Sequence, residues 1–578
     1  MLDNFEHLIA GAASVADLLA SCPALTVLVT SRELLHIRAE RHYDLAPLAL
    51  PDLGSLAAAD ELNGVPAVQL FVDRAETANR TFALTAENAR SVAEIVVRLD
   101  GLPLAIELAA ARVKVLPPAA LLARLQRRLP LLSGGAVDLP VRQRAMRSAI
   151  DWSNSLLDDD DRVLFRRLAV FDGGFTLDAA EVTAACSIDL LDGLSSLVDK
   201  SLLRVIDDPD AGPRFQMLET IRELGLDHLA ANQEADDARA HHAAWCVALV
   251  EQADPMLTGP EQARWFSRLE QDHGNIRSAL RWVVARRDAE SAMRLGGALY
   301  RFWATNGNFD EGTRWLDQIL DLQPDAQSAA RGHCLLGSGV MAYFRGQYER
   351  AESDWEQAKS LFDSLGDVRG VAYSFGNLCL VADAAGDYER ATASYEEALA
   401  LFRTLLDQTY IGFMLHNLGL IAHFQGDQER ASRLGVEALA LARGRGDRNS
   451  TVMTLGNLGL VAFAREDYRR AAAFQTEALE LGQAAANKPW LAKTVEQFAL
   501  IAAVTGKPAR AARLFAAAAA FRAKIGAAVP PNDDAVNRGY IAAVHDRLGD
   551  EPFAAAWREG DATSLAEAIR VALDPNDL

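Results

Sequence analysis

Two charged residues near the N-terminus follow apolar stretches and are of types that could do chemistry. Asp3 comes directly after Met1-Leu2, and Arg32 follows the apolar stretch 25–29 and the pair Thr30-Ser31. A carboxylate supplies the oxygen ligand that a hard cation such as Mg²⁺ prefers, and a guanidinium matches the oxygens of a phosphate. A lone acidic residue at a strand end is more often a cap, so the surrounding elements must decide.

The segments around these residues alternate between strand and helix. Residues 1–2 read as the end of a buried strand, 9–21 as an Ala- and Leu-rich helix stopped by Pro23, and 25–29 as a second strand. This alternation is typical of a doubly wound α/β domain, in which functional residues gather at the carboxyl ends of the strands. Asp3 and Arg32 both fall at such ends.

Three motifs in this order resemble the signal-transducing ATPases called STAND or NB-ARC. MLDNFEHL resembles the tail of a Walker B strand, VLVTSR resembles the sensor strand, and Gly101-Leu102-Pro103-Leu104 matches the GLPL motif, followed by a helix over 105–113. The resemblance implies ATP or ADP with Mg²⁺ as cofactors. It implies that Asp3 holds Mg²⁺ through water, that Arg32 senses the terminal phosphate, and that Pro103, in the motif opened by Gly101, packs against adenine. Gly-Leu-Pro is also a common helix start.

The phosphate-binding loop GxxxxGK[ST] of that family has no counterpart in this sequence. It should precede the Walker B strand, where Met1 and Leu2 stand, and the Gly506-Lys507 pair is followed by Pro508. Asn4 occupies the place of the second acid that many ATPases carry. We therefore expect weak nucleotide binding and no ATP hydrolysis by this chain alone, and whether it is an enzyme stays open.

A winged helix is predicted after a small helical segment that Pro117-Pro118 begin. Its pattern is three helices, a Gly173-Gly174 turn and two short strands, at 162–169, 178–186, 190–200, 202–206 and 214–217. The resemblance places a winged helix here that clamps the nucleotide domain instead of binding DNA. The acidic run 158–161 favours the clamp, although it also suits a solvated helix start. The family's MHD motif falls on 217–219, where Leu218 replaces the histidine.

A 40-residue repeat dominates the second half of the chain. GQYERA, GDYERA, GDQERA, EDYRRA and GKPARA open at positions 346, 386, 426, 466 and 506. Small residues recur at the same interval in four columns, which are Gly339, Cys379, Gly419, Gly459 and Ala499; Ala342, Ala382, Ala422, Ala462 and Ala502; Ala351, Ala391, Ala431, Ala471 and Ala511; and Ala358, Ala398, Ala438, Ala478 and Ala518. The columns predict stacked helical hairpins whose backbones approach closely.

The repeat resembles the tetratricopeptide repeat, whose usual length is about 34 residues. Longer helices or connections are therefore expected, and a generic helical-hairpin solenoid is the alternative. The segments 265–282, 515–526, 529–531 and 553–557 resemble parts of large bacterial LuxR-type and antibiotic-regulatory proteins. In many of these a DNA-binding helix-turn-helix follows. The sequence stops at Leu578 without one, so no direct DNA binding is expected.

The composition limits which partners and which cellular compartment are expected for the protein. The net charge of −21 and pI near 5.0 argue against a chain-wide nucleic-acid surface. Five cysteines without a CxxC pair fit a reducing cytoplasm and give neither a zinc site nor a disulfide framework. We expect a cytoplasmic protein without a membrane segment, and a homo-oligomer stays open.

These observations predict a mainly α fold with a partial α/β P-loop NTPase remnant, a helical bundle, a winged helix and an α-solenoid of tetratricopeptide-like repeats. The expected domains are 1–115 (the C-terminal part of a nucleotide-binding domain), 116–155 (small helical), 156–235 (winged helix), 236–335 (irregular helical repeats), 336–525 (repeats) and 526–578 (helical cap). The predicted function is a STAND-type transcriptional regulator or its truncated remnant, whose repeats sense a ligand or protein partner. The alternative is a protein-interaction scaffold with an inactive nucleotide domain.

Overall fold

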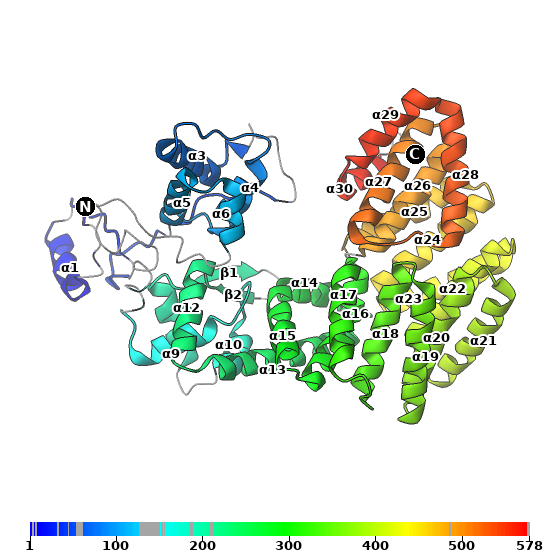
Figure 1. Ribbon diagram of the computed structural model, residues 1–578, viewed down its shortest axis with the longest axis horizontal. Helices are drawn as coiled ribbons and strands as arrows, with labels where there is room; N and C mark the ends of the chain where they lie inside the picture. Colours follow the sequence, from blue (N-terminus) through cyan, green and yellow to red (C-terminus); the bar gives the residue numbers. More distant parts are fainter. Residues whose placement is uncertain are drawn as a thin grey trace. The chain divides into compact units, whose positions relative to one another are not determined.

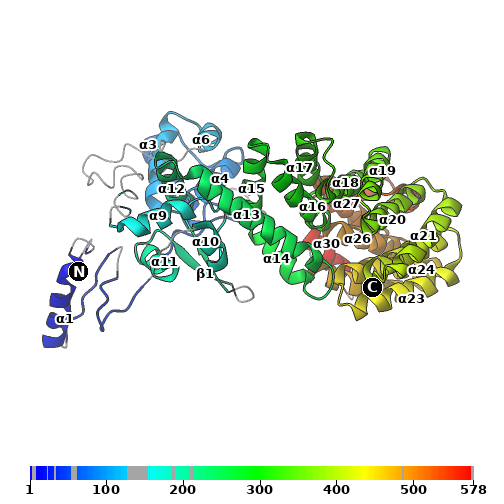
Figure 2. The ribbon, with the colours of Figure 1, turned by 90° about the horizontal axis from the view of Figure 1, so that it is seen from below.

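The chain folds into two compact units, residues 1–245 and 246–578 (Figure 1). The computed structural model describes residues 1–2, 5, 8–22, 24–31, 34–43, 45–53, 62–125, 151, 154, 156–184, 189–208, 212–484 and 487–574. Helices dominate both units in either view (Figure 2), so the predicted mainly α class is confirmed. The expected domain boundaries inside the units stay predictions.

The two N-terminal segments predicted as strands meet at a single isolated bridge, and neither forms a full strand in the described residues. Leu2 and Val29 form a parallel bridge, in which the Leu2 amide donates to the Leu28 carbonyl at 2.8 Å and the Thr30 amide donates to the Leu2 carbonyl at 2.9 Å. The predicted helix between them is present as the 3-10 turn η2 (Ile9–Gly11) and helix α1 (Ala12–Ser21). Parallel pairing across a helix is the arrangement expected of an α/β unit.

A group of short helices follows in the first unit. They are α3 (Pro66–Ala78), α4 (Ala89–Arg98), α5 (Pro103–Ala110), η3 (Ala111–Lys114) and α6 (Pro118–Arg124). Proline begins three of them, where its missing N–H costs no helical hydrogen bond. Phe71, Ile95 and Ile106 fill the interior between them and are fully buried.

The predicted winged helix is present in the first unit. It comprises α9 (Asp159–Leu168), α10 (Leu177–Ala184), α11 (Leu190–Asp199) and the antiparallel pair β1 (Arg204–Asp208) and β2 (Gly212–Gln216), followed by α12 (Glu219–Ala231). Asp158 caps α9 by accepting a hydrogen bond from the Asp161 amide at 2.8 Å. The acidic run therefore starts a helix, although Asp161 is buried and not solvated, and the clamp role of the winged helix stays a prediction.

The second unit is an array of helical hairpins. It begins within helix α13 (Ala235–Ala253), which continues into η5 (Asp254–Leu257), α14 (Gln262–Gln271), α15 (His273–Ala285), α16 (Ala289–Asn306) and α17 (Phe309–Leu322). The repeats comprise α18 (Ala329–Phe344), α19 (Tyr348–Ser364), α20 (Val368–Ala384), α21 (Tyr388–Thr404), α22 (Gln408–Phe424), α23 (Gln428–Gly444), α24 (Arg448–Ala464), α25 (Tyr468–Ala484), α26 (Lys488–Val504) and α27 (Pro508–Ile525). The C-terminal helices are α28 (Pro531–Leu548), α29 (Asp550–Asp561) and α30 (Leu565–Ala572).

Helix length explains the 40-residue period. A typical repeat has two helices of 17 residues, such as α22 and α23, each followed by a three-residue turn. Aspartates at 20-residue intervals start the helices by accepting hydrogen bonds from the first-turn amides; they are Asp367, Asp387, Asp407, Asp427 and Asp447. The expectation of longer helices than in the usual repeat is confirmed.

The small-residue columns lie where the helices cross, as predicted. Every alanine of the three alanine columns is at most 5% exposed. In the first column, a Cβ on Gly339 would lie 2.3 Å from the Trp355 indole nitrogen, and one on Gly459 would lie 1.9 Å from the Gln475 amide nitrogen. Side chains from the second helix of each hairpin thus fill the space that these glycines leave.

The array curves so far that its beginning returns to a later repeat. Gln262 of α14 donates to the Asp447 carboxylate at 3.2 Å and accepts from the Asn449 amide at 2.9 Å. Gly446 lies beside Pro260, where an added Cβ would be 3.1 Å from the proline ring. These contacts join α14 to the start of α24 within the second unit. None of the described helices is long and apolar enough to cross a bilayer.

Candidate functional site

Two of the four predicted nucleotide-binding residues lie within the described part of the chain. Asp3 and Arg32 lie outside the described residues. Gly101 has φ of +66°, its carbonyl accepts from the Leu48 amide at 3.0 Å, and a Cβ there would lie 2.3 Å from the Leu48 carbonyl oxygen. Pro103 is exposed as the first residue of α5. Close packing against Leu48 accounts for Gly101, so we derive no step of nucleotide chemistry from this turn, and the adenine contact of Pro103 stays a prediction.

The structure does bring the GLPL turn next to the segment that corresponds to the MHD motif. Asp100 accepts a hydrogen bond from the Glu219 amide at 3.1 Å, across 119 residues of sequence. Leu218, the N-cap of α12, has no side chain that could cap the helix, and Asp100 supplies the missing acceptor. Glu219 itself pairs with Arg222 at 2.8 Å. This junction ties the winged helix to the preceding helices of the first unit.

A second candidate site lies on the inner helices of the repeats, which we define as α18, α20, α22, α24 and α26. Consecutive inner helices contact one another directly, for example α22 with α24 and α24 with α26. Many of the polar side chains that the fold buries lie on them. Several hydroxyls among them, such as those of Ser374 and Thr451, bond to the main chain of their own helix, so the side chains that remain unpaired make the inner helices a candidate site.

Four amide side chains recur on the inner helices at the repeat interval. We call Asn377, Asn417, Asn457 and Gln497 the amide column; each is at most 7% exposed. Within the described chain, Asn417 Nδ2, Asn457 Oδ1 and both polar atoms of Gln497 have no hydrogen-bond partner. Buried amides in folded proteins are nearly always paired. The column therefore places amides at regular intervals within the packing of the inner helices, and the unpaired atoms of Asn417, Asn457 and Gln497 are enclosed there.

His416 contacts both the amide column and the aromatic ring of Trp490. Asn457 Nδ2 lies 3.1 Å from His416 Nε2, and the imidazole meets the Trp490 ring edge-to-face with 5.8 Å between centroids. Burial, with the nearby Lys493 cation adding to it, lowers the pKa of His416 to about 3. The imidazole is therefore neutral at physiological pH and acts as a hydrogen-bonding group.

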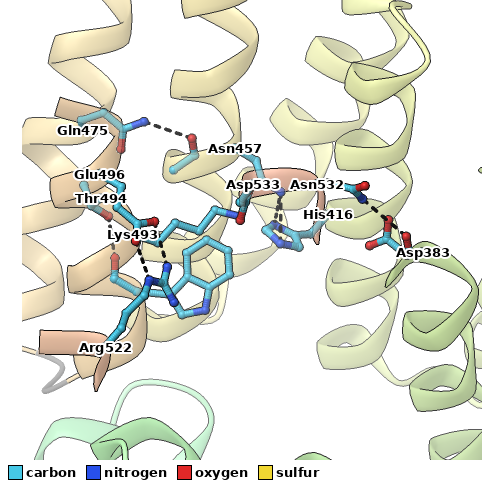
Figure 3. A network of polar contacts seen from close by, with 12 residues as sticks. Asp383, His416, Asn457, Gln475, Lys493, Thr494, Glu496, Arg522, Asn532 and Asp533 are labelled. Atoms are coloured by element: carbon cyan, nitrogen blue, oxygen red, sulfur yellow. Dashed lines mark hydrogen bonds and ion pairs between the residues drawn. The ribbon is translucent and has the colours of Figure 1, made fainter. Parts of the chain in front are cut away.

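Lys493 places a positive charge beside this cluster (Figure 3). Its Nζ lies 2.9 Å from the Asp533 carboxylate and 5.1 Å from the centroid of the Trp490 ring. The side chains of Lys493 and Asp533 are 12% and 13% exposed. Asn532, next to Asp533, donates to the main-chain carbonyl of Asp383 at 3.4 Å. A partly desolvated ion pair of this kind is screened little by salt.

Asp383 is a buried acid at the C-terminal end of α20. It is 7% exposed, and its Oδ1 has no hydrogen-bond partner in the described chain. Burial raises its pKa to about 6; the neighbouring Asp533 adds to the rise and Lys493 opposes it. A buried carboxyl group with one oxygen unpaired is a costly feature, which makes Asp383 a candidate functional residue.

Sequence reasoning did not single out Lys493, Asp533, Asp383 or the amide column. The column repeats at the same interval as the alanines, so that signal was present in the sequence. Among the described residues, no group of three His, Cys, Asp or Glu side chains is placed to hold a metal ion.

Comparison with known proteins supports the domain content. The family described as winged helix-turn-helix domain matches residues 157–226, and the family described as tetratricopeptide repeat matches residues 369–444. The tetratricopeptide prediction for the repeats and the winged-helix prediction are thereby confirmed.

Two mycobacterial relatives are similar to this chain over longer stretches than the two family matches cover. A Mycobacterium tuberculosis protein named as an HTH-type transcriptional regulator is 38% identical over 328 residues, which cover 56% of this chain and 35% of the relative. An uncharacterized protein of the same organism is 37% identical over 248 residues, which cover 42% of this chain and 60% of the relative. The chain thus spans about a third of the length of the first relative.

Among solved structures, a STAND protein with a tetratricopeptide repeat sensor from Pyrococcus horikoshii aligns with 96% of this chain and 78% of its own, at 14% identity and a TM-score of 0.39. We draw no functional argument from that likeness. The chain therefore carries a winged helix-turn-helix domain and tetratricopeptide repeats, and its homologues include proteins named as HTH-type transcriptional regulators.

Proposed function

We propose that this chain is the sensor part of a transcriptional regulator and that its repeats bind an extended peptide segment along the amide column. The ligand would be a free peptide or an exposed segment of a protein partner. The observation that carries the proposal is the row of buried, incompletely paired amides on successive inner helices.

The chemistry of the column suits a peptide backbone. Each residue of an extended chain exposes one N–H donor and one C=O acceptor. A carboxamide can pair with both at once, because it carries a donor and an acceptor on the same group. The unpaired amide atoms are enclosed, so the helices that cover them must move before a ligand can reach them. Amides at regular intervals would then hold the main chain of the ligand, while its side chains meet Lys493, Trp490 and Asp383.

The regulatory part of the proposal rests on the winged helix and on the names of the relatives. Helix α11 carries no Lys or Arg, and the acids Asp192 and Asp199 lie on it. Insertion into a DNA groove needs basic side chains against the phosphates. We therefore propose that this winged helix works within the protein, where Asp100 and Glu219 join it to the GLPL turn, and that DNA binding belongs to another part of the regulator.

The test is selection of phage-displayed peptides on the purified chain, followed by affinity measurements with a selected peptide. The variants are Asn417→Leu and Asn457→Leu, and the control is Gln357→Ala on an exposed part of the outer helix α19. Leucine removes the hydrogen-bonding groups without leaving a large cavity. We expect each column variant to weaken binding about tenfold or more, the effect of losing about 1.4 kcal/mol.

Thermal melting separates this function from a structural role. If Asn417 serves a ligand, Asn417→Leu leaves the melting temperature unchanged or raises it, because an incompletely paired buried group is removed. Asn457→Leu also removes the hydrogen bond to His416, so some loss of melting temperature is expected for that variant whatever its role. Variants that melt much lower and bind the peptide as the wild type does would contradict the proposal.

A scaffold without nucleotide chemistry is the second candidate, and the structural role of Gly101 favours it. The two candidates differ in whether nucleotide binding and peptide binding affect each other. A STAND-type switch requires ATP or ADP with Mg²⁺ to change the affinity for the peptide, and the peptide to change the affinity for nucleotide by the same factor. A scaffold requires equal peptide affinities with and without nucleotide.

A further inference from the structure

The segment between α27 and α28 runs along the inner helices. Helix α27 ends at Gly526 in the left-handed conformation, with φ of +69°. The Ala528 amide then donates to the Phe344 carbonyl at the end of α18 at 2.8 Å. Asn532 reaches the end of α20 through the Asp383 carbonyl, and Asp533 reaches α26 through Lys493 (Figure 3). We define residues 526–534 as the crossing segment.

Residues 527–530 of the crossing segment are non-helical, as a bound extended peptide would be, and residues 531–534 form the first turn of α28. Pro530 is extended, with φ of −56° and ψ of 143°, and Pro531 begins α28. Two of its three contacts with the inner helices use a main-chain group on at least one side, and the third pairs a side-chain carboxylate with Lys493. A peptide ligand would use the same kinds of contact.

The crossing segment is also lightly held. Residues 527–530 and 532–534 are half-buried, and none of the segment is fully buried. Helix α28, whose first turn belongs to the segment, fully buries Val544 alone, and its apolar contacts lie further along the helix, at Tyr540, Ile541, Val544 and Leu548. A segment with so little buried apolar surface can detach at a low free-energy cost compared with the repeats themselves.

Lys493 needs an anion where it lies. In the described chain, Asp533 is the carboxylate within ion-pair distance of its ammonium group. Removing the partner of a largely buried charge costs far more than removing a surface partner. Departure of the crossing segment would therefore leave Lys493 unpaired until another carboxylate takes the place of Asp533.

We propose that Lys493 is the carboxylate subsite of the proposed peptide site on the inner helices and that Asp533 is a built-in substitute for an acidic residue of the ligand. The crossing segment occupies this site until a peptide with an Asp, a Glu or a C-terminal carboxylate displaces it. This inference rests on the proposed function, because it names the chemistry of the ligand and the competitor inside the chain.

The test uses the full chain and a fluorescently labelled synthetic peptide with the sequence of residues 526–536. Asp533→Asn weakens the hold of the crossing segment on Lys493. The matched control is Asp534→Asn, one residue further, where the carboxylate pairs with the exposed Arg538 instead. We expect the Asp533→Asn chain to bind the labelled peptide about tenfold or more tightly than the wild type, and the Asp534→Asn chain to behave as the wild type.

Two further arms identify the subsite. Adding Lys493→Gln to the Asp533→Asn chain should abolish the gain, and so should a labelled peptide with Asn in place of its own Asp533. Hydrogen exchange should speed up at residues 527–534 in Asp533→Asn and not in Asp534→Asn. Equal peptide affinities for wild type and Asp533→Asn, or unchanged exchange, would overturn the inference.

The two proposals fail in different ways. If phage-selected peptides lose affinity with Asn417→Leu but keep it with Lys493→Gln, the amide column binds peptides and the carboxylate subsite is wrong. If the 526–536 peptide binds the Asp533→Asn chain through Lys493 while selection yields no external peptide, the subsite is right and the sensing of an external ligand is wrong.

Discussion

Trp355 and Gln475 occupy the same position three repeats apart and make the same hydrogen bond. The Trp355 indole N–H donates to the Leu336 carbonyl at 3.1 Å, and the Gln475 amide donates to the Gly456 carbonyl at 3.1 Å. In both repeats the side chain from the outer helix lies over a glycine of the inner helix. The bond is thus kept although the residue types share neither shape nor aromaticity.

This relationship predicts that Gly→Ala substitutions beneath the two side chains lower the unfolding free energy by different amounts. Gly339→Ala should cost about 3 kcal/mol of unfolding free energy, because the rigid indole of Trp355 cannot bend away. Gly459→Ala should cost about 1 kcal/mol, since Gln475 can move but loses its hydrogen bond. Gly419→Ala, whose nearest contact would be an ordinary 3.4 Å, should be neutral or stabilising. Urea denaturation measures all three, and equal losses would refute the ranking.

The alanine columns predict that overpacking destabilises the repeats. Ala431→Leu and Ala471→Leu should each lower the unfolding free energy by about 1–3 kcal/mol, because both alanines are at most 1% exposed at helix crossings. Ala440→Leu in the same helix as Ala431 is the control, since Ala440 is exposed. Thermal melts that fall equally for all three variants would count against the crossing geometry.

Asp383 predicts a dependence of stability on pH. The unfolded chain releases this proton near the ordinary pKa of 3.8 and the folded chain near 6, so raising the pH between these values favours unfolding. Asp383→Asn should therefore stabilise the protein by up to about 3 kcal/mol above pH 7, and the gain should vanish below about pH 4. The exposed Asp363→Asn is the control. A gain that does not change between pH 4 and 7 would mean that Asp383 is not buried as an acid.

The ion pair between Glu496 and Arg522 predicts non-additive variants. The two side chains meet at 2.5 Å and 2.9 Å and are each 7% exposed. Arg522→Met alone should cost about 3–5 kcal/mol, because it leaves Glu496 buried without its partner. Adding Glu496→Leu should recover most of that loss, measured by chemical denaturation in a double-mutant cycle. Additive losses would show that the pair contributes through packing alone.

The solenoid and the winged helix could be predicted from sequence because their signals are local or periodic. Ala351 and its equivalents recur every 40 residues, and the helices and strands of the winged helix alternate over short stretches. The crossing segment could not be predicted, since Asn532 and Asp383 are 149 residues apart and nothing near either residue indicates the other. Asp533 resembles any acid in the first turn of a surface helix.

One residue of the predicted nucleotide site has a second, structural explanation, while its nucleotide role stays a prediction. Gly101 matches a nucleotide-binding motif, yet its neighbour Leu48 explains the glycine, and no pattern in the sequence indicated that approach. The amide column was overlooked for another reason. Small residues at a repeat interval suggest packing at once, whereas Asn457 and its equivalents become informative only when burial shows that they are enclosed and incompletely paired.

The return of α14 to the start of α24 has a mechanical consequence. An open solenoid behaves as a soft spring, since each hairpin contacts only its neighbours and small rotations add up along the array. Gln262 bridges Asp447 and Asn449 and so closes one coil of that spring. A change of pitch in that coil must first break this bridge, which makes the curvature of the intervening repeats a stepwise property with a threshold.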